Sequence, residues 1–471
     1  MGLAAVSRLQ GLEQWGLSSD EAVYLGQGHA VVEGRLPEVR AHPPLFGLLL
    51  GAVPGGTTGE LVPRTVAVLL GLAAVVVAGL LGTELAGRTG GAVAALAVAT
   101  MPYHADVTRL VLVEVPMATT VGLALLLTVR SVRRGHPGQL EGAAAALGVA
   151  TLFKETAVLS AVALAVAVLV GVVPAHRRVV ARAAAWYVLV VATYPLYLAV
   201  TGGLSAALEF ARWQLSRAAP TGPSYTDVVL PRMGWVVLAA AVAGAVLVLV
   251  RRTPEGVTVA LAAAVPALFY TVWPVSSYPY LLVVVVPVGA LAGTAVAAAL
   301  RHPLPGGWPA RGAFAMAGTA AVVAVGAAPA TGGPPELPGA SGVPAVREAA
   351  SWLDHSADRP VVTAAPWVAN ILRAYLPDRS VASVRPAARG LSRVNPADRD
   401  ETLGSLPSGP VAVVWDAWTA THDPVATAQL LAEVRGRGGR VAHVEARESG
   451  PSSRPLVVVY VVGAGTEGGA R

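Results

Sequence analysis

Long apolar runs fill residues 61–330, and they constrain the fold of this chain more than any other feature of the sequence. A helix that crosses a bilayer needs about 20 mostly apolar residues, and shorter helices are tolerated inside a bundle. Ten runs meet this requirement, so the sequence predicts an α-helical polytopic membrane protein. The ten predicted spans are residues 61–86, 90–105, 112–130, 138–153, 155–173, 183–200, 233–250, 256–273, 279–299 and 312–330.

Arginines are concentrated in alternate loops between these runs, which orients the chain in the membrane. The positive-inside rule assigns these loops to the cytoplasm, so residues 1–60 and everything after residue 331 face outward. Arginine-, alanine- and glycine-rich usage suggests a high-GC bacterial genome, and we therefore expect a multi-pass protein of the bacterial plasma membrane. The loop arginines are Arg88, Arg130, Arg133, Arg134, Arg177, Arg178, Arg182, Arg251, Arg252, Arg301 and Arg311.

The composition excludes several classes of function. Only 13% of the 471 residues are charged, whereas a soluble chain carries about 25%. The net charge of +6 follows the membrane loops and does not predict nucleic-acid binding. The chain has no cysteine, which excludes disulfides, thiolate catalysis and thiolate metal sites.

The sequence divides into four parts. Residues 1–60 form an outward-facing N-terminal loop with juxtamembrane helices and an acidic motif, and residues 61–330 form the multi-span transmembrane body. Residues 331–343 are a Pro/Gly linker. In residues 344–471, apolar runs at 360–365, 411–415, 441–444 and 456–462 read as buried strands, and helical patterns at 344–354, 367–376 and 424–436 separate them. This alternation predicts a soluble C-terminal α/β domain on the extracytoplasmic side.

Ionisable residues at the mouths of spans are functional candidates, because charges at membrane depth are costly. The first group is Asp20 and Glu21, where Ser18 and Glu21 have the spacing of a helix capping box. The carboxylates serve either as a helix cap or as a general base, and a cap would also hold the acid in place. Arg40 and His42 form the second group, before the helix opened by two prolines, which is either an anion site or a surface turn.

Two further groups follow in the transmembrane body. Glu114 lies near the start of an apolar helix, and Arg109 is its candidate ion-pair partner, although such a pair can also serve only to order the bundle. Lys154, the only lysine of the chain, lies between two apolar half-helices. Such an interruption is typical of membrane binding sites, but a short hairpin with a snorkelling lysine has the same pattern. Carboxylates and cations on one face suit transfer chemistry with an anionic leaving group.

The order of these motifs resembles the polyprenyl-phosphate-sugar-dependent glycosyltransferases of the GT-C fold, in their protein O-mannosyltransferase and aminoarabinose transferase branch. The resemblance covers roughly residues 18–300. The motifs that carry it are Asp20-Glu21-Ala22-Val23-Tyr24, His42-Pro43-Pro44-Leu45, Pro63-Arg64, Pro102 with Arg109 and Glu114-Val115-Pro116, the corner from Gly148 to Thr156, and Ser276-Ser277-Tyr278-Pro279-Tyr280-Leu281-Leu282.

The resemblance implies a sugar donor on a polyprenyl phosphate, with its tail in the bilayer, and a protein, lipid or cell-wall glycan as acceptor. Asp20 matches the general base, and Glu21 supports it or helps to place a metal ion. The remaining positions are associated with donor-phosphate and acceptor binding. These positions are Arg40, His42, Arg64, Arg109, Glu114, Lys154 and Tyr280.

The sequence departs from the family pattern at two positions of the site. Pro279 stands where that family has an arginine, and Glu114 stands where an aspartate is more usual. The family also has a helix before the acidic pair, and residues 1–19 are too short and polar to span, so we expect that first helix to be missing from this chain. No cofactor follows from the motifs, although Glu21, His42 and His104 are candidate ligands for a divalent metal ion.

Two other functions fit the same residues. A transporter or flippase of lipid-linked substrates also buries charge, but it predicts related halves and mid-membrane ionisable residues. A non-catalytic scaffold descended from such an enzyme would explain the departures from the family pattern. The charges gather on one face and no internal repeat stands out, which favours the glycosyltransferase.

Overall fold

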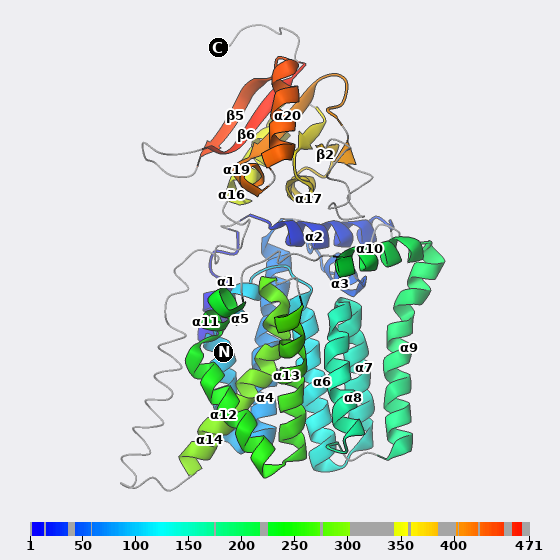
Figure 1. The fold of residues 1–471 in the computed structure, drawn as a ribbon, viewed down its shortest axis with the longest axis vertical. Coiled ribbons are helices and arrows are strands. Elements are labelled where there is room, and N and C mark those ends of the chain that lie inside the picture. The colour runs from blue at the N-terminus through cyan, green and yellow to red at the C-terminus, as the bar shows by residue number, and fades with distance from the viewer. Residues whose placement is uncertain are drawn as a thin grey trace.

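The molecule consists of a bundle of long helices and a small β-sheet domain, with the helix α2 (Ser19–Val32) lying across the junction between them (Figure 1). The structure is a computed structural model. It describes residues 2–13, 16–35, 43–57, 59–173, 176–216, 225–273, 277–301, 343–356, 359–384, 402–403, 405–422, 424–446 and 455–463.

The longest element, α4 (Leu61–Thr100), is a helical hairpin. Gly87 has a left-handed backbone conformation (φ 75°, ψ −172°), which breaks the helix into two legs. The legs are close enough that a Cβ on Gly79 would lie 3.1 Å from the Cβ of Ala95. The predicted spans 61–86 and 90–105 are therefore the two legs of this hairpin. The second leg ends at Thr100, and Pro102 starts a separate short helix, α5 (Pro102–Val107).

Seven further apolar helices coincide with predicted spans. Five helical segments of the described residues are each long and apolar enough to cross a membrane alone, and the count is six if a bent pair formed by Tyr225–Met233 and α12 is one span. The predicted span 312–330 lies outside the described residues. The seven are α6 (Glu114–Arg134), α7 (Pro137–Phe153), α8 (Val158–Leu169), α9 (Arg177–Thr201), α12 (Trp235–Arg251), α13 (Pro254–Val272) and α14 (Val285–Arg301), the last preceded by the 3₁₀ helix η4 (Tyr278–Val284).

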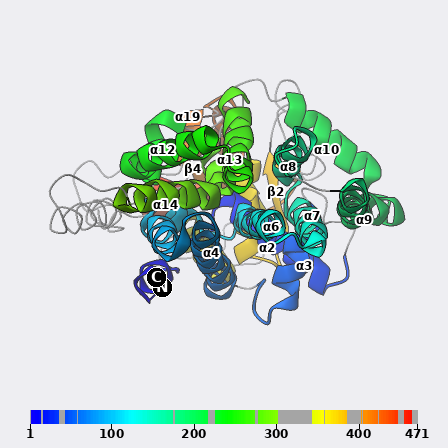
Figure 2. The same cartoon turned by 90° about the horizontal axis from the view of Figure 1, so that it is seen from below.

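The bundle packs around α4, α6 and α14. Figure 2 shows α14 between α4 and α12, with α6 next to α7. Arginines join the helix ends that lie farthest from α2. Glu84 of α4 pairs with Arg130, Arg133 and Arg134 of α6, and Arg301 of α14 donates to the carbonyl of Ala86. The basic loops of these three helices thus meet at one end of the bundle, as predicted.

Short helices cover the other end of the bundle. They follow the sequence closely, since α3 begins directly after Pro43-Pro44 and α5 has a proline at its first position. Figure 1 shows α2, α3 and α10 lying nearly perpendicular to the long helices. The short elements are α1 (Gly2–Leu9), α3 (Leu45–Ala52), α10 (Leu204–Ser216), α11 (Leu230–Met233), η2 (Glu155–Ala157) and the π-helical η3 (Tyr225–Val229).

The C-terminal part is an α/β domain with a six-stranded sheet in the order β3-β2-β1-β4-β6-β5. The first four strands in this order are parallel, and β6 and β5 are antiparallel to their neighbours. The predicted strands correspond to β1 (Val361–Thr363), β4 (Val411–Asp416), β5 (Arg440–Ala446) and β6 (Pro455–Val462). Sequence analysis missed β2 (Val381–Val384) and β3 (Thr402–Leu403), which are too short for a clear pattern.

The C-terminal domain packs onto α2 through α17 (Pro366–Tyr375). Its other helices are α16 (Val343–His355), α19 (Ala417–His422) and α20 (Pro424–Gly436). Ala22 of α2 is buried in the same apolar cluster as Val368 and Leu372 of α17. The opposite side of α2 packs into the core of the bundle through Tyr24 and Leu25. The acidic motif therefore lies between the bundle and the C-terminal domain.

Candidate active site

The acidic motif forms the first turn of α2. The Ser18 hydroxyl accepts a hydrogen bond from the Glu21 backbone N–H at 3.3 Å, and the Glu21 carboxylate accepts one from the Ser18 N–H at 2.9 Å. This reciprocal capping box confirms the spacing argument. It also separates the two acids, because the Asp20 side chain is exposed whereas Glu21 is fully buried.

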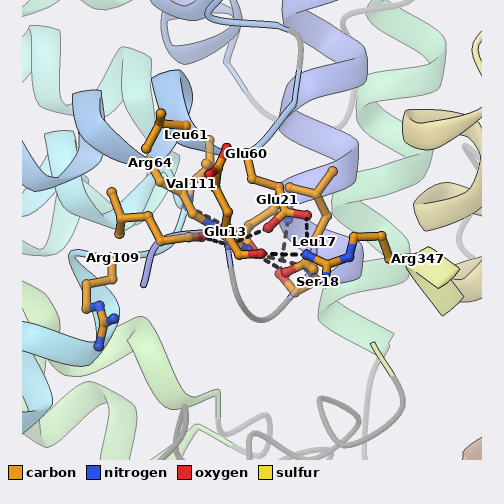
Figure 3. Close-up of polar contacts among 12 residues, drawn as sticks. Glu13, Leu17, Ser18, Glu21, Glu60, Leu61, Arg64, Arg109, Val111 and Arg347 are labelled. Atoms are coloured by element: carbon orange, nitrogen blue, oxygen red, sulfur yellow. Dashed lines mark hydrogen bonds and ion pairs between the residues drawn. The ribbon is translucent and has the colours of Figure 1, made fainter. Parts of the chain in front are cut away.

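Glu21 is held by Arg64, which lies one turn inside α4 (Figure 3). Arg64 Nε donates to Glu21 Oε1 at 2.8 Å, and Nη2 donates to Oε2 at 3.0 Å. The backbone N–H of Val111 donates to Oε1 at 3.0 Å. With the bond from Ser18, each carboxylate oxygen of Glu21 accepts two hydrogen bonds, which is the capacity of an ionised carboxylate.

The guanidinium of Arg64 is equally occupied. Its remaining N–H groups donate to Glu60 Oε2 at 2.8 Å and to the carbonyls of Leu12 and Gly16. All five N–H groups of an arginine are then in use, and the side chain is fully buried. We expected Arg64 to bind the donor phosphate, but in this structure it has no N–H group left and instead fastens the segment that precedes α2.

These contacts set the charge of Glu21. Burial opposes ionisation, but the charge and hydrogen bonds of Arg64, with the two backbone N–H groups, outweigh it and hold the pKa of Glu21 below its usual value. Glu21 is therefore an ionised structural carboxylate. Its lone pairs are already used, so the expected roles as catalytic partner or metal ligand are not served by this arrangement.

A second buried ion pair joins α6 to the corner after α7. Lys154 Nζ donates to Glu114 Oε1, and the two residues are 4% and 3% exposed. Glu114 therefore pairs with Lys154, and the expected pairing with Arg109 is wrong. The other carboxylate oxygen, Glu114 Oε2, has no hydrogen-bond partner among the described residues. Lys154 Nζ also lies 4.5 Å from the ring centroid of Tyr280, within the range of a cation–π contact.

The backbone explains why Lys154 reaches this position. The helix α7 ends at Phe153, Lys154 is extended (φ −150°, ψ 130°), and the 3₁₀ turn η2 follows. The chain is thus interrupted between two apolar helices, as predicted, and the lysine points into the bundle. A snorkelling side chain would be exposed, and this one is not.

Tyr24 connects Asp20 with this pair. Burial raises the pKa of Tyr24 well above its usual value, and the charges of Glu114 and Asp20 raise it further. Asp20 lies one helical turn before Tyr24 on α2, and the charges of Glu114 and Lys154 also act on the Tyr24 phenol. Tyr24 is therefore the residue that relates the acidic motif to the buried pair.

A third polar cluster surrounds Asp106 on α5. Arg232 of α11 donates to Asp106 Oδ2 from Nε at 2.8 Å, and the Tyr278 hydroxyl donates to the same oxygen at 3.2 Å. Arg109 donates to the carbonyl of Gln10 and interacts with the charge of Asp106. Arg109 therefore lies beside this cluster, whereas the ion pair of Glu114 is with Lys154.

His104 is the remaining candidate metal ligand in the described residues. Its Nδ1 is 3.0 Å from Arg8 Nη2 and must accept that bond. Burial, with the charge of Arg8, lowers the pKa of His104 well below its usual value. No three histidine or acidic side chains of the described chain converge on a metal position. Arg40 and His42 lie outside the described residues.

Sequence analysis missed Glu60, Arg232 and Tyr375. Glu60 precedes Pro63-Arg64 by three residues, and its i,i+4 spacing to Arg64 is a signal that was available. Arg232 and Tyr375 belong to segments far from the motifs, and they reach the site only through the tertiary fold.

The chain is similar in sequence to one known family and in structure to several solved proteins. Residues 41–199 match the family described as dolichyl-phosphate-mannose-protein mannosyltransferase. No curated protein matches the chain by sequence. Among solved structures, the chain is similar to ArnT from Cupriavidus metallidurans bound to undecaprenyl phosphate, with a TM-score of 0.67 and 15% identity over 97% of this chain and 96% of ArnT.

Two further structures have the same fold. The archaeal oligosaccharyltransferase AglB from Archaeoglobus fulgidus, in complex with an inhibitory peptide and a dolichol-phosphate, gives a TM-score of 0.59 and 14% identity over 97% of this chain and 75% of AglB. The arabinofuranosyltransferase AftD from Mycobacteria gives 0.52 and 17% over 98% of this chain and 40% of AftD. The chain thus has the fold of these three proteins, and the family match over residues 41–199 agrees with the resemblance predicted from the motifs.

Proposed function

We propose that this protein transfers a sugar, mannose or another hexose or pentose, from a polyprenyl phosphate to an acceptor on the extracytoplasmic side of a bacterial plasma membrane. The acceptor is a protein, a lipid or a cell-wall glycan. The observation that carries the proposal is the difference between the two acids at the start of α2. Glu21 is buried and hydrogen-bonded to Arg64, whereas the adjacent Asp20 is exposed.

Asp20 is proposed as the general base. The acceptor hydroxyl attacks the anomeric carbon, the bond from that carbon to the phosphate oxygen breaks, and the polyprenyl phosphate leaves with the bonding electrons. Asp20 takes the proton of the attacking hydroxyl. A base must stay within hydrogen-bond reach of its substrate, and the capping box with the Arg64 lock holds the first turn of α2 rigidly enough for this.

Lys154 and Tyr280 are proposed to hold the phosphate of the donor. Lys154 is a buried cation over the ring of Tyr280, and its partner Glu114 has one oxygen without a hydrogen bond among the described residues. A phosphate that leaves gains negative charge, and a nearby ammonium stabilises it. The similar structures of ArnT and AglB contain undecaprenyl phosphate and a dolichol-phosphate, which supports a donor of this class.

The test supplies radiolabelled undecaprenyl-phosphate mannose, and the corresponding pentose donor, to membranes that carry the protein or its Asp20→Asn variant. We expect Asp20→Asn to lower transfer by about a hundredfold or more, because general-base catalysis contributes about 10²–10⁴-fold, while undecaprenyl phosphate still binds. Glu13→Gln, an exposed carboxylate in the preceding loop, is the matched control and should remain active.

Lys154→Gln tests phosphate binding separately from general-base catalysis. It should weaken binding of undecaprenyl phosphate, which Asp20→Asn leaves unchanged. Equal transfer by the native protein and by Asp20→Asn would refute the general-base assignment. Binding of the lipid phosphate without any sugar transfer, for the native protein and a full set of donors, would favour a transporter or a scaffold.

A further inference from the structure

The C-terminal domain reaches into the acidic motif through Tyr375, the last residue of α17. The Tyr375 hydroxyl accepts a hydrogen bond from the backbone N–H of Leu17 at 2.8 Å and donates to Glu60 Oε1 at 2.5 Å. Burial, with the charge of Glu60, raises the pKa of Tyr375 above its usual value. The phenol therefore keeps its proton, and it can serve as a donor and an acceptor at once.

Arg347 of α16 makes a second contact from the same domain. It donates to the backbone carbonyl of Glu13, and its Nη1 lies 3.5 Å from Glu60 Oε1 (Figure 3). The N–H of Leu17 and the carbonyl of Glu13 both belong to the segment between α1 and α2. The C-terminal domain thus holds the main chain of this segment at two points.

Glu60 connects these contacts to the bundle. Its Oε1 faces Tyr375 and Arg347, whereas its Oε2 accepts from Arg64 Nη1. Arg64 in turn binds Glu21 and the carbonyl of Gly16. On one side of Leu17, the carbonyl of Gly16 is held by Arg64 of the bundle, and on the other side Ser18 caps α2. The N–H of Leu17 itself is held by Tyr375 of the C-terminal domain.

We propose that Tyr375 and Arg347 are positioning residues, through which the C-terminal domain sets the place of Asp20 for the transfer reaction. The inference rests on the proposed role of Asp20 as general base. Leu17 lies three residues before Asp20, and the described residues between Leu9 and Ser19 form neither helix nor strand. Without regular structure, hydrogen bonds to the main chain decide where this segment and the first turn of α2 lie.

The packing of α2 supports the same conclusion. Ala22, two residues after Asp20, is buried in the apolar cluster of α16 and α17, which includes Val346 and Leu372. The far half of α2 packs instead on α3 of the membrane part, where a Cβ on Gly28 would lie 3.1 Å from that of Leu50. The C-terminal domain thus contacts the N-terminal end of α2, which Arg64 also holds from the bundle, while the other end packs on the membrane part.

The kinetics of variants distinguish a C-terminal domain that positions the base from one that only covers the site. Loss of positioning should lower kcat and leave the donor KM nearly unchanged, since the phosphate contacts lie on other elements. We expect Tyr375→Phe, which removes a single oxygen atom, to lower kcat by between about tenfold and about a hundredfold, the range that a base misplaced by about 1 Å produces.

The kinetic test uses the full chain in membranes with radiolabelled undecaprenyl-phosphate mannose. Arg347→Gln is the second variant and should lower kcat in the same direction. Tyr460→Phe makes the same chemical change in β6 of the same domain, away from the contacts described above, and should behave as the native protein. Asp20→Asn is measured alongside, so that failure of the general-base assignment is recognised separately.

A spectroscopic readout tests the position of the motif without relying on catalysis. The chain has no cysteine, so a nitroxide can be attached at Ser19→Cys or Gly26→Cys alone. Tyr375→Phe should increase the mobility of the label at residue 19 and leave the label at residue 26 unchanged. Gly26 is exposed, and a Cβ there meets no atom within 4 Å.

Several results would overturn the inference. It fails if Asp20→Asn is inactive but Tyr375→Phe and Arg347→Gln keep the native kcat. It also fails if Tyr460→Phe lowers kcat as much as Tyr375→Phe, or if the label at residue 19 keeps its native mobility. Activity retained by Asp20→Asn would instead refute the proposed general base.

Discussion

Asp20 and Glu21 are adjacent acids whose roles the fold separates. The capping box is compatible with either acid as the base, because it places both residues in the first turn of α2. The difference arises from Arg64, which comes from another helix and saturates the carboxylate of Glu21. Glu114 shows the same effect, since its partner is Lys154, forty positions away, and not the nearby Arg109.

The buried pair of Glu21 and Arg64 should make stability depend on pH. The folded state lowers the pKa of Glu21 below that of the unfolded chain, which is about 4.3 for a glutamate. The stability gained is therefore complete above the unfolded pKa and is lost as pH falls through the folded pKa. Glu21→Gln should lower stability at neutral pH by about 3–5 kcal/mol, because it leaves a buried arginine partly unpaired.

Thermal unfolding of the detergent-solubilised protein from about pH 7 down to about pH 2 measures this contribution, since the loss begins near the ordinary pKa of a glutamate and continues below it. The acid-dependent part of the unfolding profile should become flatter in Glu21→Gln. Glu33→Gln is the matched control, because Glu33 lies at the end of the same helix in exposed ion pairs with His29 and Arg35. A similar loss of stability in both variants would contradict the assignment of Glu21 as a structural carboxylate.

At the scale of elements, breaks in the helices matter as much as the helices themselves. The break between α7 and η2 directs the side chain of Lys154 into the bundle, where it is a buried cation. The turn at Gly87 divides the 40 residues of α4 into two legs. Apolar helices of the described residues coincide with all the predicted spans except 312–330, because a continuous apolar run is a local signal. The ends of the elements depended on neighbours, as at Thr100, where α5 starts as a separate helix.

Close packing of the second leg of α4 against α14 leads to a test of the bundle. A Cβ on Gly293 would lie 2.3 Å from the carbonyl oxygen of Gly90, a contact that the backbone must move to relieve. We expect Gly293→Ala to lower stability by about 1–3 kcal/mol, as overpacking does. Gly138→Ala is the control, since a Cβ there meets no atom within 4 Å. Equal melting temperatures of the two variants would show that α14 does not pack this closely.

The arginine cluster around Glu84 and the C-terminal domain lie at opposite ends of the molecule. The arginine clusters around Glu84 lie at one end of the bundle, and α2 with the C-terminal domain lies at the other (Figure 1). A membrane thick enough to cover the long helices then separates these two groups. The proposed site, at α2, belongs to the side of the C-terminal domain.

Single-cysteine labelling tests which side this is. A membrane-impermeant maleimide should label Ser351→Cys, an exposed position of α16, in intact cells. It should label Gly138→Cys, an exposed position near the arginine-rich end, only after the membrane is permeabilised. The reverse pattern would place the C-terminal domain in the cytoplasm and exclude the proposed extracytoplasmic acceptor.

The sequence by itself determined the membrane bundle, the α/β character of the C-terminal part, the GT-C resemblance and the residues from which a site can be built. These features depend on local periodicity, on the alternation of basic loops and on short motifs. Only the tertiary structure decided that Arg64 is a structural lock, that Glu114 pairs with Lys154 and that Tyr375 reaches the acidic motif. Those roles depend on contacts between residues that are far apart in the sequence. A buried charge must be compensated by a partner, and the identity of that partner decides which role the charge can serve.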